Sequence, residues 1–494
     1  MMGQQEPNQT KLFSYNINLE ERVRPDHPLR KIKALVDFDF VSKKVKPLYG
    51  YNGNVSVPPP VILKLMFLLF YEDVASEREL MATVPERLDW LWFLDFDLES
   101  KVPDHSVLSK ARERWGRGLF EEYFQNIIWQ CVEAGLIDGR KIFCDSSLVD
   151  ADASNNSVMK REKFFRYWRE RYGELERRFF NWDEDAPKKK LVSQTDPDAS
   201  IIRKGKGKPR ARYAEHRAVD ERAGVITATL TTPGAVNEAH KLDELLDEHH
   251  NNTKVSVEVA VADSKYGTAD NYLMLRDRNV RGHISDLSAT QRGSSRRKGI
   301  FDISEFIYDE ACDMYTCPAG QRLKRRKKKN KRCAFEYSAP RKTCMACKLR
   351  GQCTRNKDGA RTIKRHVRQE DIDEMRRIAE SPQAKRDLRT RKHFMERSYA
   401  DAANNHGFKR SRWRGIEKVT IQNLLIAVVQ NIRILIAKGR KPAGGAQEER
   451  DGRANGKHLT TIISDCRIQL GDLWLNLSKC RLLSDRINLG FGAF

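Results

Sequence analysis

The chain has 494 residues, of which 39% are hydrophobic and 32% are charged, and its formal net charge at pH 7 is +23. This length predicts about two to four domains, and ten cysteines are too few for a disulfide scaffold in so long a chain. The positive charge favours a polyanionic partner, although a basic, well-solvated surface gives the same composition. The first residues are polar, and the longest apolar stretches (61–71 and 424–436) are interrupted by charged or polar residues. We therefore expect no signal peptide, no membrane span and a cytoplasmic protein.

The first part of the chain has a helical pattern. Residues 1–16 are predicted to be a flexible N-terminus, and residues 17–137 an all-α domain. One of its helices, DHSVLSKARERWG, starts at Asp104 and places its basic residues largely away from its apolar face. Two short helices before such a helix are typical of a helix-turn-helix that reads DNA, and a merely solvated helix is the alternative. The residues expected to contact DNA here are Lys110, Arg112 and Arg114.

Residues 138–287 change to a mixed pattern of strands and helices. Apolar and β-branched runs predict strands at residues 141–149, 211–220, 224–232, 255–262 and 280–285. Helices are predicted at residues 162–181 and 237–249, and a basic loop with Gly and Pro at residues 193–212. The aromatic stripe on the first of these helices indicates core packing or a dimer contact. This order predicts an α/β domain, a mixed sheet flanked by helices.

A basic, cysteine-rich insert, residues 288–370, interrupts this domain. Its run QRLKRRKKKNKR is either a disordered loop or a contact with nucleic acid, and inside a globular protein we expect the contact. The residues expected to make it are Arg325, Arg326, Lys327 and Lys328. Residues 371–438 resume a helical pattern as the second part of the interrupted domain, and residues 439–494 are a tail to which we assign no role.

Two carboxylates stand at predicted strands. Asp145 follows the apolar Ile142, Phe143 and Cys144, and Asp263 ends the apolar run VSVEVAVA. In open α/β sheets, chemistry gathers outside the carboxyl ends of strands, and phosphodiester cleavage by two metal ions needs carboxylates that converge. Each acid alone could equally be an ordinary residue that caps a turn.

A third acid for such a site would come from a helix. Glu396 lies in an amphipathic stretch and is the candidate, although a glutamate on a basic helix is usually part of a surface ion pair. The basic residues that follow it, and that are expected to contact phosphates, are Lys409, Arg410, Arg412 and Arg414.

The insert contains six of the ten cysteines. Cys344 and Cys347 have the spacing of a zinc knuckle, and Cys317 and Cys353 could complete a four-thiolate structural site. Reduced cysteines without metal are the alternative, because the second pair lacks the tight spacing of a zinc ribbon.

The segments CDSSLVDADAS, VADSKYGTADNY and ERSYADAANNHGFKRSRWRG together resemble a DDE-superfamily transposase of a bacterial insertion sequence. The likeness is to the branch with a cysteine-containing insert before the last acid, and PDHSVLSKARERWG is similar to the all-α domain that commonly precedes it. The resemblance implies a ribonuclease-H-like fold with Asp145, Asp263 and Glu396 as the catalytic acids. One departure is that Ser146 and Ser147 follow the first acid, where many relatives have Gly and Thr.

This resemblance implies a nucleoid-associated enzyme that binds double-stranded DNA. We expect it to bind the terminal inverted repeats of its element, to cut and join them to target DNA with Mg²⁺ or Mn²⁺, and to act as a homodimer or higher oligomer. A ribonuclease-H-like nuclease without strand transfer is one alternative, and a DNA-binding repressor derived from a transposase is another.

Overall fold

The computed structural model describes residues 18–50, 55–160, 163–164, 191–287, 299–329 and 333–438. The flexible N-terminus, almost all of the helix predicted at 162–181, the tail 439–494 and the side chains of Lys327 and Lys328 lie outside the described residues.

The N-terminal part is all-α, as predicted. Its helices are α1 (Leu19–Arg22), α2 (Pro28–Leu35), α3 (Phe40–Val45), α4 (Pro59–Tyr71), α5 (Glu77–Thr83), α6 (Leu88–Leu94) and α7 (Ser106–Glu133). α4 begins with two prolines, which the first turn tolerates, and it is buried along nearly its whole length. Inside α7, Gly116 has φ 68° and ψ 176°, so the basic helix predicted from Asp104 ends there and a second helix follows it.

The central sheet is mixed. Its strands are β1 (Lys141–Asp150), β4 (Ser200–Ile202), β5 (Arg210–Asp220), β6 (Ile226–Pro233), β7 (Val259–Ala262) and β8 (Arg281–Ile284). Their order is β4-β5-β1-β7-β8, with β6 also paired to β5. β1, β5 and β6 are antiparallel, whereas β1, β7 and β8 are parallel. Three antiparallel strands followed by two parallel ones make the sheet ribonuclease-H-like, as expected.

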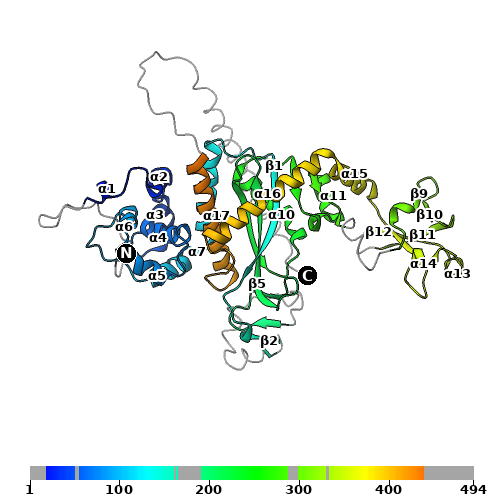
Figure 1. Cartoon of the computed structure of the whole chain (residues 1–494), viewed down its shortest axis with the longest axis horizontal. Helices are drawn as coiled ribbons and strands as arrows, with labels where there is room; N and C mark the ends of the chain where they lie inside the picture. The colour runs from blue at the N-terminus through cyan, green and yellow to red at the C-terminus, as the bar shows by residue number, and fades with distance from the viewer. Residues whose placement is uncertain are drawn as a thin grey trace, which may run out of the picture. The chain divides into compact units, whose positions relative to one another are not determined.

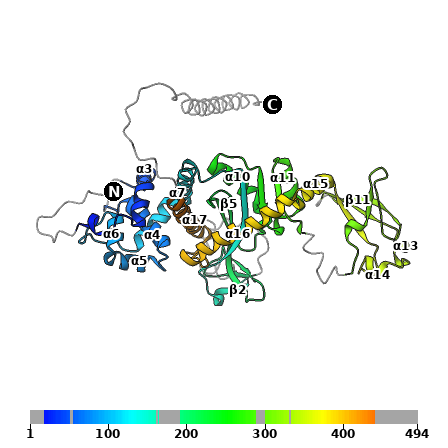
Figure 2. The same cartoon turned by 45° about the horizontal axis from the view of Figure 1, so that its top comes forward.

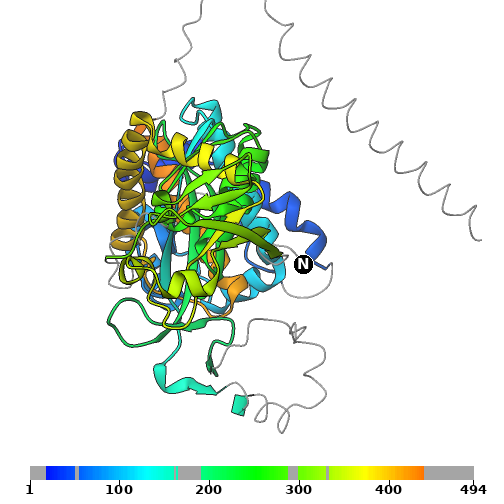
Figure 3. The same ribbon diagram turned by 90° about the vertical axis from the view of Figure 1, so that its right-hand side faces the viewer.

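Part of the loop predicted at residues 193–212 is a strand, so that prediction is wrong for β4. Ser200 pairs with Arg212 of β5, and Ile202 pairs with Arg210. β3 (Leu191–Ser193) pairs with β2 (Val158–Lys160) in a separate small sheet beyond the end of β5 (Figures 1 and 3). The pairing partner, rather than the local sequence, makes these short segments extended.

Helices cover both faces of the sheet. Successive residues of β1 point to opposite faces: Ile142 and Cys144 pack with α10 (Leu242–Thr253), α11 (Ala269–Asp277) and α15 (Gln369–Glu380). Phe143 packs with α16 (Pro382–Asn405) and α17 (Ile416–Lys438). Figures 1 and 2 show α16 crossing the sheet diagonally over β1 and β5. Both faces of the sheet are therefore covered by helices, while β1 stays partly exposed from Asp145 to Leu148.

α17 joins the sheet domain to the N-terminal helices. Residues of α4, α7 and α17 share one hydrophobic cluster with Phe143 of β1. Among the described helices, α17 alone is long and apolar enough to cross a membrane, but 78% of its apolar window is buried inside the protein. That burial is the property of a core helix, so α17 gives no support for a membrane span.

The cysteine-rich insert has its own sheet and core. Its strands, in the order β13-β12-β11-β10-β9, are β9 (Ile307–Asp309), β10 (Met314–Thr316), β11 (Arg322–Lys329), β12 (Ala334–Ser338) and β13 (Thr362–His366). The short helices α13 (Arg341–Met345) and α14 (Arg350–Cys353) complete it. The basic run is thus largely strand β11, and the alternative of a disordered loop is wrong for that part. Tyr315, Leu323 and Tyr337 form the centre of this separate core.

Candidate active site at the ends of the central strands

The first two predicted acids come from neighbouring strands. β1 and β7 run parallel, and the last pair of their ladder is Phe143 with Val261. Asp145 lies two residues further along β1, Asp263 follows the last residue of β7, and the two carboxyl groups interact electrostatically. Asp263 follows the last residue of β7 and caps the short helix η5 (Ser264–Tyr266), where its Oδ1 accepts the backbone N–H of Lys265 at 2.9 Å. Asp263 is thus held where a strand turns into a helix.

Asp145 is held from two sides. Its Oδ1 accepts the backbone N–H of Ser146 at 2.8 Å, and its Oδ2 accepts a hydrogen bond from Arg391 Nη1 of α16 at 2.9 Å. Burial raises the pKa of Asp145 above its usual value, and the neighbouring Asp263 raises it further, whereas Arg391 opposes both effects. A nearby cation stabilises the charged form of a carboxylate that burial disfavours in this way.

Glu396 does not join these two acids. The residues of α16 that meet the sheet near Asp145 are Arg391, Met395 and Tyr399, four residues apart. Glu396 follows Met395 and therefore lies about 100° further round the helix. Its side chain is 69% exposed and lies 3.9 Å from Lys392, which is the ordinary surface pairing that the sequence left open.

A carboxylate that sequence reasoning missed contacts the residue next to Asp145. Glu238 begins the short helix η4 (Glu238–Lys241), a short loop after β6 ends at Pro233, and is only 11% exposed. Its Oε2 accepts a hydrogen bond from Ser146 Oγ, and its Oε1 lies 2.6 Å from Lys265 Nζ. The available signal was an acid at a strand-to-helix junction, the same signal that identified Asp263.

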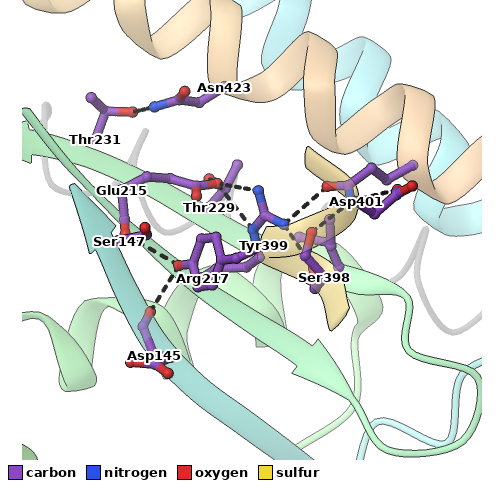
Figure 4. Close-up of polar contacts among 12 residues, drawn as sticks. Asp145, Ser147, Glu215, Arg217, Thr229, Thr231, Ser398, Tyr399, Asp401 and Asn423 are labelled. Carbon is purple, nitrogen blue, oxygen red and sulfur yellow. Dashed lines mark hydrogen bonds and ion pairs between the residues drawn. The ribbon is translucent and has the colours of Figure 1, made fainter. Parts of the chain in front are cut away.

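On strand β5, next to Asp145 and Ser147, lies a buried ion pair. Glu215 and Arg217 of β5 are both fully buried, with Arg217 Nη2 2.9 Å from Glu215 Oε1. Arg217 is the antiparallel partner of Asp145 in the sheet. Its guanidinium also donates to Ser398 Oγ at 2.7 Å and stacks 4.6 Å from the ring of Tyr399 (Figure 4).

This pair connects the sheet to α16 and α17. Arg217 Nη1 donates to Gln430 Oε1 of α17 at 2.9 Å, and Thr229 Oγ1 of β6 donates to Glu215 at 2.8 Å. The Tyr399 hydroxyl donates to the backbone oxygens of Asp145 and Glu215, at 3.2 and 3.3 Å (Figure 4). The rotation of α16, and with it the placement of Arg391 and Glu396, is therefore set by buried polar contacts on strand β5.

Two family models match the chain, a transposase domain (DUF772) over residues 17–114 and a transposase DDE domain over residues 316–436. Both domains are those of a DDE transposase. The second match includes Glu396 but begins after Asp145 and Asp263, so the placement of those two acids on neighbouring parallel strands is an independent observation. A transposase DDE domain implies the use of divalent metal ions.

Similarity to solved transposases is weak. A piggyBac transposase synaptic complex with hairpin DNA is 10% identical, with 84% of this chain and 76% of that chain covered and a TM-score of 0.31. A Mos1 transposase paired-end complex is 10% identical, with 47% and 61% covered and a TM-score of 0.15. Structural similarities this low support no conclusion about this transposase. No curated protein matches the sequence.

The acids of the transposase fit a hard divalent cation in part. Asp145 and Asp263 supply the oxygen ligands that Mg²⁺ and Mn²⁺ prefer, and they come from rigid elements, Asp145 from within β1 and Asp263 from the end of β7. Across the described ranges, however, no three His, Cys, Asp or Glu side chains are grouped tightly enough to hold a metal ion. Glu396, the predicted third ligand, is not grouped with Asp145 and Asp263.

The basic residues predicted to contact DNA divide into exposed and buried ones. Lys110 and Arg114 of α7 are exposed. Arg112 is 4% exposed, forms an ion pair with Glu77 and stacks 3.8 Å from the ring of Trp413. The prediction of a DNA contact is therefore wrong for Arg112, which stabilises the interior instead.

The basic residues after α16 divide in the same way. Lys409 Nζ donates to Ser147 Oγ of β1 at 3.1 Å, two residues from Asp145. Arg410 and Arg414 are exposed, and each pairs with Asp152. Arg412 is nearly buried and pairs with Asp73 at 2.8 Å, so it is not a free phosphate contact in this structure. On the insert, Arg325 and Arg326 are exposed.

The four predicted zinc ligands gather in the insert. Cys317, Cys344, Cys347 and Cys353 line one small cavity of about 30 Å³. Burial raises the pKa of the Cys353 thiol, Arg361 lowers it, and the other three cysteines raise it. The folding of the insert thus brings together thiols that are up to 36 positions apart in the chain, although not closely enough to form a metal-holding group as they stand.

Proposed function

We propose that this transposase binds the terminal inverted repeats of its element and catalyses metal-dependent DNA strand cleavage and strand transfer. The observation that carries the proposal is the placement of Asp145 and Asp263 on the adjoining parallel strands β1 and β7, in a chain that matches a transposase domain and a transposase DDE domain. Mg²⁺ or Mn²⁺ is the proposed ion, because the ligands are carboxylates.

In this proposal, Asp145 and Asp263 hold the divalent ion. Such an ion lowers the pKa of an attacking water and neutralises charge on the leaving 3′ oxygen. Arg391 donates to the Asp145 carboxylate and would keep it in its orientation, and the proposed role of Lys409, which contacts Ser147, is to bind a DNA phosphate. Tyr266 and Tyr399 are both buried, so neither is placed to act as a nucleophile, and the reaction needs no covalent protein–DNA intermediate.

DNA binding is assigned to exposed basic residues. The proposed contacts are Lys110, Arg114, Arg325, Arg326, Lys409, Arg410 and Arg414. Contacts of this kind bind phosphates and make affinity fall as salt rises. Because two element ends must be joined to one target, we propose that the protein acts as a dimer or higher oligomer on DNA.

The decisive test uses labelled DNA from the ends of the element together with a supercoiled target. We expect nicked end DNA, and then joined products, with Mg²⁺ or Mn²⁺ and neither with EDTA. Cleavage without any joined product would favour the nuclease alternative. Binding of end DNA without cleavage under either metal would favour a repressor derived from a transposase and would contradict the proposal.

We also propose a structural zinc site in the insert, formed by the four cysteines that line one cavity. The full-length protein, purified without chelator, should then contain about one zinc ion per chain, and Cys347→Ser should lower this content strongly. Metal analysis by mass spectrometry measures it. Cys312→Ser is the matched control, because Cys312 is an exposed cysteine of the same insert outside the cavity. Equal zinc in both variants, or none in the wild type, would rule the site out.

A further inference from the structure

A cleft between α16 and α17 has no part in the reaction proposed above. Its volume is about 340 Å³, within the range of roughly 300–1,000 Å³ that is usual for ligand sites. Both helices line it with residues of their second halves, and the turn between β5 and β6 contributes Gly224. A cleft of this size can hold a small molecule or a short stretch of a polymer.

The charged side chains that line the cleft are mostly cationic. Arg397 comes from α16, and Arg433 and Lys438 come from α17, against the single carboxylate of Asp401. Within the described residues, the Arg397 guanidinium lies 5.9 Å from the centre of the Phe394 ring, and Lys438 Nζ donates to a backbone oxygen at 3.0 Å. Neither of these partners is negatively charged, so Arg397 and Lys438 keep their positive charge for a ligand.

The Asp401 carboxylate is engaged from inside the protein. It accepts hydrogen bonds from Gln430 Nε2 at 2.8 Å and from Asn405 Nδ2 at 2.7 Å, and Arg433 Nη1 lies 3.2 Å from it. Asp401 and Arg433 therefore compensate one another. The attraction of the cleft for an anion comes from Arg397 and Lys438.

The cleft also has an apolar part, to which Phe394, Ile226 and Ile434 contribute. Phe394 packs against Phe143 of β1, with 5.3 Å between the ring centres, so its ring is held in place. A ligand that carries charged and apolar groups in turn suits such a lining. The backbone of DNA is a ligand of this kind, because a charged phosphate alternates with a deoxyribose ring, and proteins follow it with positively charged grooves.

The polar lining of the cleft belongs to the buried network that fixes α16. Ser398 and Gln430 both line the cleft. Arg217 donates to Ser398 Oγ at 2.7 Å (Figure 4) and to Gln430 Oε1 at 2.9 Å. The two helices that form the cleft are thus held by contacts inside the protein, and the cleft needs no ligand in order to form.

We propose that this cleft binds the sugar–phosphate backbone of DNA, with Arg397 and Lys438 as the phosphate contacts. The inference rests on the proposed function, because DNA is the substrate of that function, and it adds a contact surface on α16 and α17. The basic residues predicted from the sequence to contact DNA lie on α7, on the insert and after α16, and none of them lines the cleft. Contacts to the backbone carry no base specificity, so the cleft should bind DNA of any sequence.

Fluorescence anisotropy of a labelled duplex of unrelated sequence, with the full-length protein in EDTA, tests this without cleavage. We expect Arg397→Gln/Lys438→Gln to weaken binding at least about threefold at physiological salt. The slope of log affinity against log salt should become shallower by about 1 to 2, since each phosphate contact contributes about 0.9. Lys392→Gln/Lys418→Gln is the matched control, because it removes one charge from each of the same helices outside the cleft, at side chains that are 71% and 42% exposed. The control should stay close to wild type in affinity and slope.

A second variant tests the cleft without removing any of its contacts. Ala437 is an exposed residue of the cleft lining, and Ala437→Glu adds a negative charge there. It should also weaken DNA binding, and it repeats the test if the double variant does not fold. Circular dichroism of each variant shows whether a loss of binding is a loss of fold.

The outcomes separate this inference from the function on which it rests. If wild type binds DNA and the cleft variants keep its affinity and salt slope, the cleft is not a DNA site and the proposed function stands. Equal losses in the cleft and control variants would point to surface charge in general and would overturn the inference. So would a cleft variant that loses only the binding of inorganic phosphate, measured by titration calorimetry, because the cleft would then be a small-anion site. If wild type binds neither unrelated DNA nor element-end DNA, the proposed function itself is contradicted.

Discussion

Asp145→Asn should reduce cleavage of element-end DNA by at least about a thousandfold, which corresponds to about 4 kcal/mol of transition-state stabilisation. Asn has the size of Asp but lacks the charge that holds a divalent cation. Initial rates of strand nicking in Mg²⁺ measure the effect, and Asp263→Asn should behave alike because Asp263 follows the parallel strand next to β1. A nicking rate within tenfold of wild type would contradict the assignment of Asp145.

Asp152→Asn is the matched control for that experiment. Asp152 follows β1 by two residues and pairs with the exposed Arg410 and Arg414. Such surface pairs contribute about 0–1 kcal/mol, so its nicking rate should stay within about fivefold of wild type. Equal losses of nicking rate in both variants would show that nicking depends on negative charge near β1 in general, and not on Asp145 as a metal ligand.

The fold of Asp145→Asn should survive, and the direction of its pH dependence follows from burial. The pKa of Asp145 is raised in the folded protein, so its contribution to stability is most favourable at low pH and declines as the pH rises through that raised value. Removing the charge should therefore leave the unfolding midpoint at neutral pH unchanged or higher. If Asp145→Asn loses nicking activity but keeps its unfolding midpoint, the role of Asp145 is in the reaction and not in stability.

Elements that carry their own local signal could be predicted from the sequence. β6 and β7 have β-branched or apolar runs that are followed by turn residues. α11 has Thr268 as its N-cap, and α5 has Ser76, and both starts were predictable because a capping hydroxyl satisfies free backbone N–H groups within the first turn. The two aspartates at strand ends followed from the same local reasoning.

Features decided by distant contacts could not be predicted. β11 is a strand of lysines and arginines, and it is extended because β10 and β12 pair with it. Arg112 reads as a basic surface residue, but Glu77 and Trp413, 35 residues before it and about 300 after it, bury it. Each case depends on a partner that the local sequence does not contain.

The third acid was the least predictable part of the site for the same reason. A helix with polar residues on several sides does not say which side faces the sheet, and here contacts to Arg217 and Asp145 decide it. In the orientation that α16 adopts, Glu396 is 69% exposed and pairs with Lys392 on its own helix. The sequence suggested an acid on this helix, but it could not show which side of the helix would face the sheet.

Arg217→Met should lower the free energy of unfolding by about 3–5 kcal/mol, the usual cost of breaking a buried ion pair on one side. Met approximates the size of the side chain but leaves Glu215 as a fully buried carboxylate without its cation. It also removes the contacts to Ser398 and Gln430 that fix α16 and α17. Urea denaturation followed by circular dichroism measures the change.

Two comparisons make this expectation specific to the buried pair. Arg210→Met removes an arginine of the same strand that is 58% exposed and pairs with Asp150, so it should cost only about 0–1 kcal/mol. The double variant Arg217→Met/Glu215→Leu removes both charges and should recover a large part of the loss, because well-packed apolar residues can replace a buried pair. If Arg217→Met costs no more than Arg210→Met, the pair does not hold α16 against the sheet. If the double variant regains stability but still nicks DNA slowly, Arg217 acts by positioning α16, and thereby Arg391, against Asp145.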